Sequence, residues 1–401
     1  MKAALKLGML GTDPRIAAVA AEATRRGHEI AITVDMPVPA ARAGDSGGLL
    51  DPAVCDAVLV GRDGWTAERA EAVRLLVQAG RPLLASHPLD LSMLWAWEVE
   101  MIRRDVGGVI VPLLPERLHP FVARLQALIE AGLAGSGPLG GVESLVLERR
   151  LASRARSDVL AALALDADLV RVLTGDPARL SALGVGPESD PAAWQTLVVG
   201  FTGPMSVPVR WQAAAGGEPG VRLTVHCERG SAAVEIPADW SRSWRWSQSG
   251  QVDGEQESAL AAATLGVLES AVSADPSAVA GQGYPAAVPA ATWADAARAI
   301  ELADAVPRSI AKGRAVDLHQ EEFSDLGTFR GTMASLGCGI ILAALGLVIL
   351  AALVGGLAHE FDWALGGRVA GAWPFVALAA LGGFLLLQLL PLLVAGSGRH
   401  E

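Results

Sequence analysis

The first third of the chain alternates short apolar runs with segments of helical periodicity. The apolar runs are LKLGML, HEIAITVD, DAVLVG, RPLLAS and GGVIVPLL, and they are rich in branched side chains. Such runs are typical of parallel strands that are buried on both faces of a sheet. Helical stretches such as TAERAEAVRLLVQAG and SMLWAWEVEMIRRD lie between the later runs. Strands that alternate with helices predict a doubly wound α/β domain.

Further along, the pattern changes to an alternation of apolar and polar residues. A helix-like stretch at 120–133 comes first, and strand-like alternations follow at 142–150, 195–201, 206–213, 221–228 and 231–236. The same region is rich in tryptophan, with residues Trp194, Trp211, Trp240, Trp244 and Trp246. Large aromatic side chains favour the packing of a sheet core, and the alternative is an exposed patch for a partner. The pattern predicts a second domain that contains both helix and sheet.

The C-terminal part contains two uncharged apolar runs, at 333–357 and 369–396. Each exceeds the ~20 residues that a helix needs to cross a bilayer, and the alternative is a pair of buried core helices. Lys and Arg residues flank the two runs, whereas Arg368 is the only one between them. The positive-inside rule then places both ends in the cytoplasm. We therefore predict two transmembrane helices that anchor the protein in the cell (inner) membrane as a multi-pass protein with cytoplasmic soluble domains.

Composition narrows the possible partners. The 401 residues are ample for two or three domains. The formal net charge is −11 and no basic tract is present, which argues against nucleic acid as a partner. The three cysteines, Cys55, Cys227 and Cys338, lie far apart without the spacing of metal ligands. We expect neither a disulfide framework nor a metal site.

Several stretches taken together resemble the Gfo/Idh/MocA oxidoreductases. They are CDAVLVG with AERAEAVRLLVQAGRPLLASHPLDLS, then RLHPFVARLQALIEAGLAGSGPLGGVESLVLER, DLVRVLTGDP, LTVHCERGSAAVEIP and AARAIELADAVPRSIAKGRAVDL. The resemblance covers residues 4–320, and it implies a Rossmann domain followed by an α+β domain with an open, mostly antiparallel sheet. It also implies a homo-oligomer that associates through the open sheet.

With the apolar tail, the resemblance predicts three parts. A truncated Rossmann-like domain, with a degenerate NAD(P)-binding site, occupies residues 1–118. The α+β domain occupies residues 119–328, and the transmembrane helical hairpin occupies residues 329–401.

The turn after the first strand departs from the dinucleotide-binding fingerprint. That fingerprint needs glycine where the backbone approaches the pyrophosphate and where the helix packs on the strand. Gly11 fits the first position, but Asp13 occupies the second and Ile16 the third. A carboxylate repels a diphosphate, and both side chains hinder its approach. The candidate cofactor-binding residues are Gly11, Thr12, Asp13 and Asp35, of which Asp35 is either a ribose ligand or a solvated loop acid.

The segment after Asp35 is short. Only MPVPAARAGDSGGLLDPAVC separates it from the strand that starts near Asp56, and this segment is rich in Pro, Gly and Ala. The family resemblance implies a helix and another strand here, and a crossover needs at least ~10–12 residues including its helix. We therefore expect that one β-α unit of the nucleotide-binding half is missing.

The candidate catalytic positions are also altered. The sequence SHP contains His87 where the family has Glu-Lys-Pro, whose lysine contacts nicotinamide and substrate. A histidine can transfer protons near neutral pH, and the alternative is a structural role at the strand end. The family's active-site helix has the pattern D-x-x-x-H-x-x-D. When the pattern is aligned on Asp168, its first two positions are Ala161 and Leu165, which cannot transfer a proton.

These features predict a catalytically degenerate, membrane-tethered member of the family that acts as a binding or scaffold module without a cofactor. The alternative is a working oxidoreductase that uses NAD or NADP on a sugar or polyol-like substrate, with His87 and an altered phosphate turn. Asp166 would then be a displaced acid, although one residue along a helix turns a side chain by about 100°. Nucleotide binding separates the two hypotheses.

Overall fold

The computed structural model describes residues 4–35, 47–186, 192–203, 205–214, 216–257, 259–273 and 289–318, with isolated helical positions between 346 and 360. The chain divides into two units, Met1–Leu318 and His319–Glu401. Among the residues described, no helix is both long and apolar enough to cross a bilayer. The two predicted spans, 333–357 and 369–396, lie almost entirely outside the described residues, so the hairpin stays a prediction.

A parallel sheet forms the first layer of the unit Met1–Leu318. Its five strands have the order β2-β1-β3-β4-β5. Their bounds are β1 Lys6–Leu10, β2 Glu29–Val34, β3 Ala57–Val60, β4 Leu83–Ala85 and β5 Ile110–Pro112. All four residues of β3 are buried, as expected for a parallel strand that is covered on both faces. The predicted Rossmann-like sheet is therefore present.

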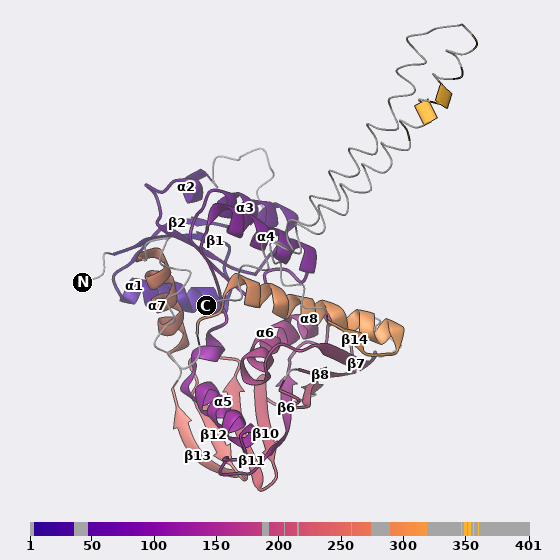
Figure 1. Ribbon diagram of the computed structural model, residues 1–401. Helices are drawn as coiled ribbons and strands as arrows, with labels where there is room; N and C mark the ends of the chain where they lie inside the picture. The colour runs from indigo at the N-terminus through magenta and orange to yellow at the C-terminus, as the bar shows by residue number, and fades with distance from the viewer. Residues whose placement is uncertain are drawn as a thin grey trace, which may run out of the picture. The chain divides into compact units, whose positions relative to one another are not determined.

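The helices that pack on this sheet come from two separate parts of the chain. Those next to the strands in sequence are α1 Pro14–Arg25, α2 Gly47–Leu50, α3 Ala67–Gln78 and α4 Met93–Val106. Two later helices also pack here: α7 Leu260–Ser273 lies against α1, and α8 Trp293–Lys312 lies against α4 (Figure 1). The first domain thus receives helices from the far end of the unit. The boundary at 118/119 stays a prediction.

The expected loss of one β-α unit stays a prediction, because residues 36–46 lie outside the described residues. In the Rossmann order a further strand lies outside the second one. Here β2 is the edge strand of the described sheet, and β1 pairs directly with β3 on its other side. The described residues between β2 and β3 contain only the four-residue helix α2.

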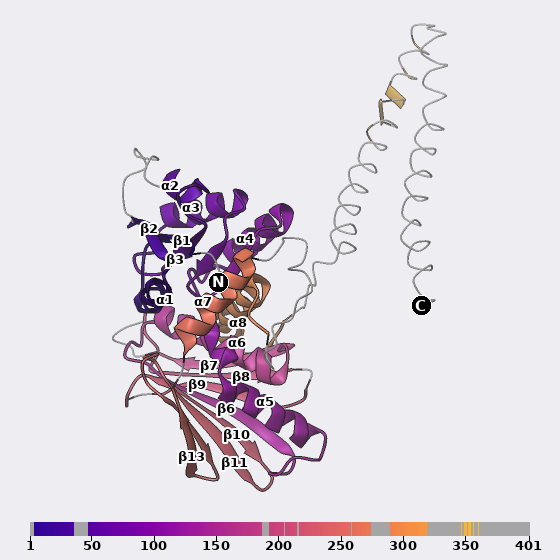
Figure 2. The ribbon, with the colours of Figure 1, turned by 90° about the vertical axis from the view of Figure 1, so that its left-hand side faces the viewer.

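The second sheet has nine strands in the order β13-β12-β11-β10-β6-β9-β8-β7-β14 (Figure 2). Only β6 and β9 pair in parallel, so the prediction of a mostly antiparallel sheet is confirmed. The strands are β6 Val142–Arg150, β7 Arg179–Val185, β8 Thr196–Thr202, β9 Val209–Ala214, β10 Gly220–Cys227, β11 Gly230–Pro237, β12 Trp244–Gln248, β13 Gln251–Gln256 and β14 Val316–Asp317.

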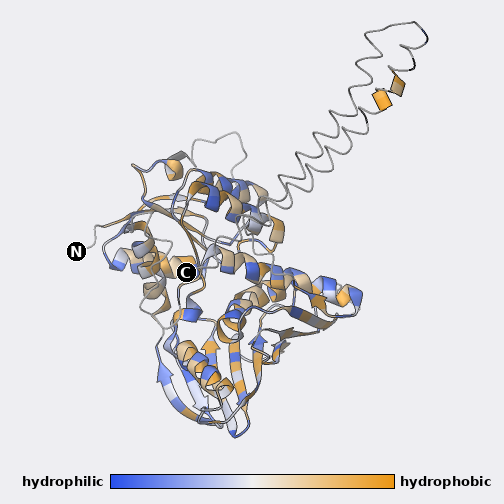
Figure 3. Ribbon diagram, viewed as in Figure 1, coloured by the Kyte–Doolittle hydropathy of each residue, from blue (hydrophilic) through white to orange (hydrophobic). Residues whose placement is uncertain are grey.

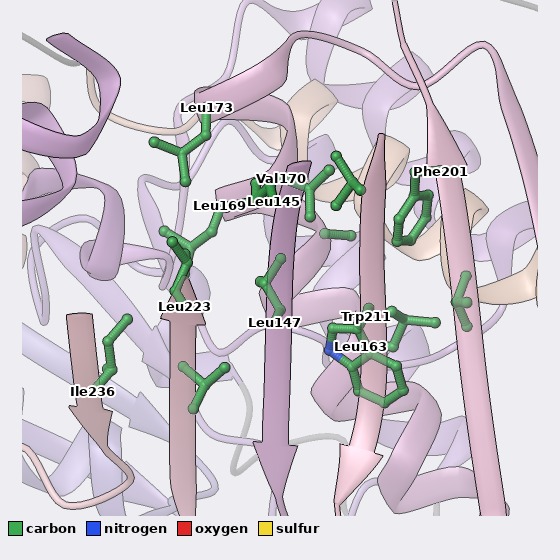
Figure 4. Packing of buried hydrophobic residues seen from close by; sticks show 14 of the residues in the cluster. Leu145, Leu147, Leu163, Leu169, Val170, Leu173, Phe201, Trp211, Leu223 and Ile236 are labelled. Atoms are coloured by element: carbon green, nitrogen blue, oxygen red, sulfur yellow. The ribbon is translucent and has the colours of Figure 1, made fainter. Parts of the chain in front are cut away.

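The helices η2 Pro115–Leu118, α5 Pro120–Leu133 and α6 Arg156–Thr174 lead into and cover this second sheet. Bands of apolar and polar residues alternate along its strands (Figure 3). The apolar side chains form one core with α6, which includes Leu147, Leu223 and Trp211 of the strands and Leu163 of the helix (Figure 4). The other face of the sheet remains polar on most of its strands.

Four of the five predicted tryptophans confirm the packing interpretation. Trp211, Trp244 and Trp246 have no exposed surface, and Trp194 is 4% exposed. Trp240 is half-buried and packs against two core clusters. Large rings of this kind fill the space between a sheet and the helices that cover it.

Candidate functional site

The site begins at the turn after β1, where α1 starts. Asp13 is the residue that caps α1, and its side chain is 8% exposed. Its Oδ1 accepts hydrogen bonds from the backbone N–H groups of Arg15, at 2.9 Å, and Ile16, at 3.0 Å. The first amides of a helix lack partners within the helix, so a capping acid stabilises this end. Sequence and geometry agree, because Asp is a favoured N-cap and Pro14 suits the first helical position.

The other oxygen of Asp13 reaches two neighbouring strands. Its Oδ2 accepts from the backbone N–H of Arg62, which follows β3, at 2.9 Å. It also accepts from the hydroxyl of Ser86, which follows β4. The donors therefore come from the carboxyl ends of parallel strands and from a helix N-terminus. In a Rossmann fold, this edge of the sheet is where a ligand's phosphates bind.

The chain itself uses the hydrogen-bond donors at this edge of the sheet. The amides that would approach a pyrophosphate already donate to the Asp13 carboxylate, and Pro14 has no N–H to offer. The neighbouring loops are also in close contact, since a Cβ placed on Gly61 would lie 2.3 Å from the Cα of Thr12. Thr12 is exposed, and its backbone lies against the loop that contains Gly61. The arrangement does not fit a dinucleotide pyrophosphate while Asp13 keeps its position.

A buried arginine lies beneath the same turn. Arg69, on α3, has no exposed surface and donates to the backbone carbonyl of Asp63. A Cβ on Gly11 would lie 2.5 Å from its Nη1, so the guanidinium fills the space under the turn. Asp35, the candidate ribose ligand, is 83% exposed and lies 3.7 Å from Nη2 of Arg69. A ribose hydroxyl would compete with this ion pair.

His87 is buried at the end of β4, with 5% of its surface exposed. Burial lowers the pKa of His87 to about 3, and a hydrogen bond to the backbone of Ala164 opposes this effect. The positive charges of Arg15, Arg62 and Arg117 lower the pKa further. Its Nε2 has no hydrogen-bond partner among the residues described. His87 is therefore neutral near pH 7, and the backbone of Ala164 holds its ring at the end of β4.

The two altered positions of α6 are apolar and packed. Ala161 is 2% exposed, and Leu165 packs against the core of the first sheet. Asp166 has no exposed surface and accepts from the guanidinium of Arg149, on β6, and from Nε1 of Trp211 at 2.8 Å. The acid next to the family's active-site positions is thus held in a buried ion pair.

Asp168 is held in the same way by Arg117, which follows β5 in η2. Two nitrogens of the Arg117 guanidinium donate to the Asp168 carboxylate, and its Nη1 lies 3.6 Å from Asp295 on α8. Burial raises the pKa of Asp168, and the charge of Arg117 opposes the rise. These contacts connect η2, α6 and α8, so Arg117 has a structural role.

His119 also has a structural place. It caps α5 by accepting from the backbone N–H of Phe121 at 3.1 Å, and its ring stacks on Trp244 with 3.9 Å between centroids. Burial lowers the pKa of His119 to about 4. Among the residues described, no group of three or more His, Cys, Asp or Glu side chains is placed to hold a metal ion.

Sequence reasoning did not identify Arg69 and Arg149 as part of this site. Arg69 lies four residues before Val73, on the buried face of α3, and that spacing is the signal that could have placed it. Arg149 alternates with Leu145 and Leu147 on the covered face of β6. An arginine in phase with buried leucines indicates a buried acid as its partner.

Known proteins resemble this chain in fold but not detectably in sequence. No protein-family model matches the sequence, and no curated protein matches it. Solved structures do match. A myo-inositol dehydrogenase from Corynebacterium glutamicum has a TM-score of 0.53 and 18% sequence identity, and the match covers 79% of this chain and 99% of that chain. The UDP-N-acetylglucosamine 3-dehydrogenase of Acidithiobacillus ferrooxidans has a TM-score of 0.57 and 20% identity, with 77% and 99% covered.

A third match is an oxidoreductase from Agrobacterium radiobacter in complex with NAD+, L-tartaric acid and magnesium. Its TM-score is 0.56 and its identity 15%, with 79% of this chain and 98% of that chain covered. This chain has the Gfo/Idh/MocA-type oxidoreductase fold. The predicted resemblance is confirmed at that level. At these identities the likeness concerns the fold, and the function has to be argued from the site.

Proposed function

We propose that this chain is a catalytically degenerate protein of the Gfo/Idh/MocA fold that acts as a binding or scaffold module and takes no dinucleotide. One observation carries the proposal. The carboxylate of Asp13 already accepts the hydrogen bonds of Arg15, Ile16, Arg62 and Ser86 at the phosphate edge of the sheet. An anionic cofactor would have to displace a carboxylate that is part of the chain, and the two negative charges repel each other.

The remaining chemistry supports the same proposal. Proton transfer during hydride transfer needs a group that titrates near the working pH. His87 has a pKa of about 3, and Ala161 and Leu165 have no titrating side chain. Arg149 pairs with Asp166, and Arg117 pairs with Asp168. A buried carboxylate paired with arginine serves the fold better than it serves proton transfer.

A working NAD(P)-dependent oxidoreductase on a sugar or polyol-like substrate is the second candidate, and the comparisons favour it. The matched structures from Corynebacterium glutamicum and Acidithiobacillus ferrooxidans are dehydrogenases of an inositol and of a nucleotide sugar, and the one from Agrobacterium radiobacter contains NAD+. On this candidate Gly11, Thr12 and Asp35 would hold the cofactor and His87 would transfer the proton. Asp13 would have to leave the start of α1.

The proposal includes a membrane anchor. The uncharged runs 333–357 and 369–396 support a helical hairpin in the cell membrane, with the soluble unit in the cytoplasm. Self-association through the outer face of the nine-stranded sheet is part of the same proposal, and it rests on analogy with the fold. Either feature would suit a module that holds a ligand or a partner at a membrane surface.

Cofactor titration tests the proposal. Full-length protein in an uncharged detergent is titrated with NAD+, NADH, NADP+ and NADPH, and binding is followed by calorimetry. The expected dissociation constants are weaker than about 1 mM, which corresponds to about 4 kcal/mol of binding free energy or less. A micromolar constant for any of the four would overturn the proposal. In that case Asp35→Asn should weaken binding if Asp35 contacts the ribose.

A further inference from the structure

The outer face of the nine-stranded sheet contains a hollow of about 230 Å³, far from the phosphate turn in sequence. It lies where β6 ends, β10 begins, β11 ends and β12 begins; these strands are neighbours in the sheet (Figure 2). Its lining includes four arginines, Arg150, Arg222, Arg242 and Arg245. We call it the arginine hollow.

The arginines reach this face because the strands alternate. On β10, Val221 and Leu223 are buried in the core, and Arg222 between them therefore faces outward. The pairing register places Arg222 opposite Glu235 of β11, and Glu235 opposite Arg245 of β12. Three charged side chains of alternating sign thus form a row across three strands.

Glu235 orients two of the arginines. Its Oε1 lies 3.5 Å from Nη1 of Arg222, and its Oε2 lies 2.6 Å from Nη2 of Arg245. One carboxylate is thus shared by two guanidinium groups, and the register also places Glu148 of β6 opposite Arg222 and Glu255 of β13 opposite Arg245. Cross-strand pairs of this kind restrict the rotamers of exposed arginines, which reduces the entropy that ligand binding costs. Glu218 pairs with Arg242 at the rim of the hollow.

Arg150 is the arginine without a carboxylate. Among the described residues, no acidic group lies within ion-pair distance of its guanidinium. Its aliphatic part packs under the backbone of Gly217, where an added Cβ would lie 3.2 Å from Cδ and 3.6 Å from Nε. The φ of Gly217 is +82°, a conformation that favours glycine. The turn thus holds the stem of Arg150 in place at the edge of the hollow.

We propose that the arginine hollow binds a small oxyanion of the phosphate or phosphate-ester class. Four arginines face three glutamates, Glu218, Glu235 and Glu255, so the lining has one net positive charge. Guanidinium groups bind tetrahedral oxyanions through two parallel hydrogen bonds. The volume of about 230 Å³ is smaller than that of pockets for drug-sized ligands and suits a phosphate or a compact ester. The proposal does not depend on whether the first sheet takes a dinucleotide, because the hollow lies in the other sheet.

Phosphate titration of full-length protein tests this site. Protein in an uncharged detergent at low salt is titrated with inorganic phosphate, and binding is followed by calorimetry. The wild type should bind with a millimolar or tighter constant, and Arg150→Gln should weaken binding about tenfold, since it removes the unpaired guanidinium. Arg150→Lys keeps the charge but loses the two-pronged geometry, and its affinity should lie between the two.

Arg179→Gln is the matched control. Arg179 lies on β7 and has 60% of its side chain exposed, paired with Asp317. The phosphate affinity of Arg179→Gln should equal that of the wild type. An absence of binding at about 10 mM phosphate, or equal weakening by the Arg150 and Arg179 substitutions, would overturn the proposal, because the binding would then be absent or non-specific. NAD(H) titration of Arg150→Gln reports separately on the first sheet.

A lipid headgroup offers the same phosphate chemistry as a free ester. Full-length protein in nanodiscs that contain phosphatidate separates the two sources. If headgroups reach the hollow, inorganic phosphate should bind more weakly in these nanodiscs than in detergent, and Arg150→Gln should remove the difference. Equal affinity in both, still dependent on Arg150, assigns the hollow to a soluble phosphate ester.

Discussion

The hydroxyl of Ser86 donates a hydrogen bond to the carboxylate of Asp13 and so joins the end of β4 to the turn after β1. The backbone amide of Arg62 donates to the same oxygen from the loop after β3. Hydrogen bonds to an ionised group are stronger than neutral ones, and a low local dielectric strengthens them further. The edge of the sheet that holds a cofactor in many Rossmann folds is here stabilised by an internal anion.

Replacing Asp13 with Ala should lower the free energy of unfolding by about 2–4 kcal/mol. The change removes an N-cap and leaves the buried hydroxyl of Ser86 and the amide of Arg62 without an acceptor. Urea unfolding followed by tryptophan fluorescence measures the loss. Ser92→Ala is the control, because Ser92 caps α4 through one hydrogen bond of 3.3 Å to Trp95, and it should cost about 1 kcal/mol. Equal losses would contradict the wider role of Asp13.

The elements with unbroken periodicity could be predicted from the sequence. The stretches 120–133 and 142–150 coincide with α5 and β6, because their apolar residues stay in phase with one covered face. The pattern of apolar and polar residues does not predict strand β7. Its Leu183 and Val185 are 71% and 55% exposed, so its apolar residues do not mark the covered face. Strand β12 was predicted only as part of a tryptophan-rich region, since Trp244 and Trp246 are too few to show a period.

The sequence predicts only those features of the site that depend on residues close together in the chain. The conflict between Asp13 and a diphosphate follows from the turn itself, but the partners Arg62 and Ser86 lie 49 and 73 residues further along the chain. Their meeting depends on the order of the parallel strands. In the same way, the sequence does not show that Asp166 is ion-paired. Its partner Arg149 lies on a strand that packs next to α6 only in the fold. Hydrogen bonds between distant elements follow from topology.

The stability of the protein should fall as the pH decreases below about 6.5, partly through His87. Its pKa is about 3 in the folded state, against 6.5 for an ordinary histidine. Below pH 6.5 the unfolded chain therefore binds a proton at His87 that the folded chain does not bind. The free energy of unfolding then falls by about 1.4 kcal/mol for each pH unit until the folded pKa is reached. The loss of unfolding free energy between pH 7 and pH 5 should be about 2 kcal/mol smaller in His87→Gln than in the wild type.

The exposed His226, on β10, supplies the control for this experiment. His226→Gln replaces a surface imidazole and should change the free energy of unfolding by less than about 0.5 kcal/mol. His119 should behave like His87 over a narrower range, because its pKa is about 4. If His87→Gln and the wild type lose stability equally, His87 titrates normally in the folded protein, and its role as an acid–base group becomes tenable again.

Asp166→Ala should destabilise the protein by about 3–5 kcal/mol, because it leaves the buried guanidinium of Arg149 without its partner. It also removes the acceptor of the Trp211 indole N–H. Asp317→Ala breaks an exposed ion pair with Arg179 and should cost less than about 1 kcal/mol. Thermal or urea unfolding compares the two. An Asp166 variant as stable as the wild type would indicate an acid that is kept for chemistry.

Full-length protein should sediment with membranes and resist extraction by high salt and by carbonate. The reason is the apolar content of the runs 333–357 and 369–396, each long enough to span a bilayer. A reporter fused after Glu401 should give a cytoplasmic signal, and one inserted at Asp362 should give a signal from the opposite side. Release by salt alone would show that the tail binds peripherally, and signals from the same side would rule out a hairpin.

Asp13→Gly should create a site for pyrophosphate that the wild type lacks. The substitution frees the hydrogen-bond donors at the start of α1 and at the ends of β3 and β4, and a helix N-terminus with free amides attracts anions. The experiment is done in an Arg150→Gln background, so that the arginine hollow does not contribute. Pyrophosphate at about ten times its dissociation constant should stabilise the variant by about 1.4 kcal/mol, which raises Tm by about 2 °C. Sodium chloride of equal ionic strength should have no such effect. A comparable rise in protein that retains Asp13 would show that its carboxylate leaves the helix readily, and the NAD(P)-dependent oxidoreductase would then become the better account of this fold.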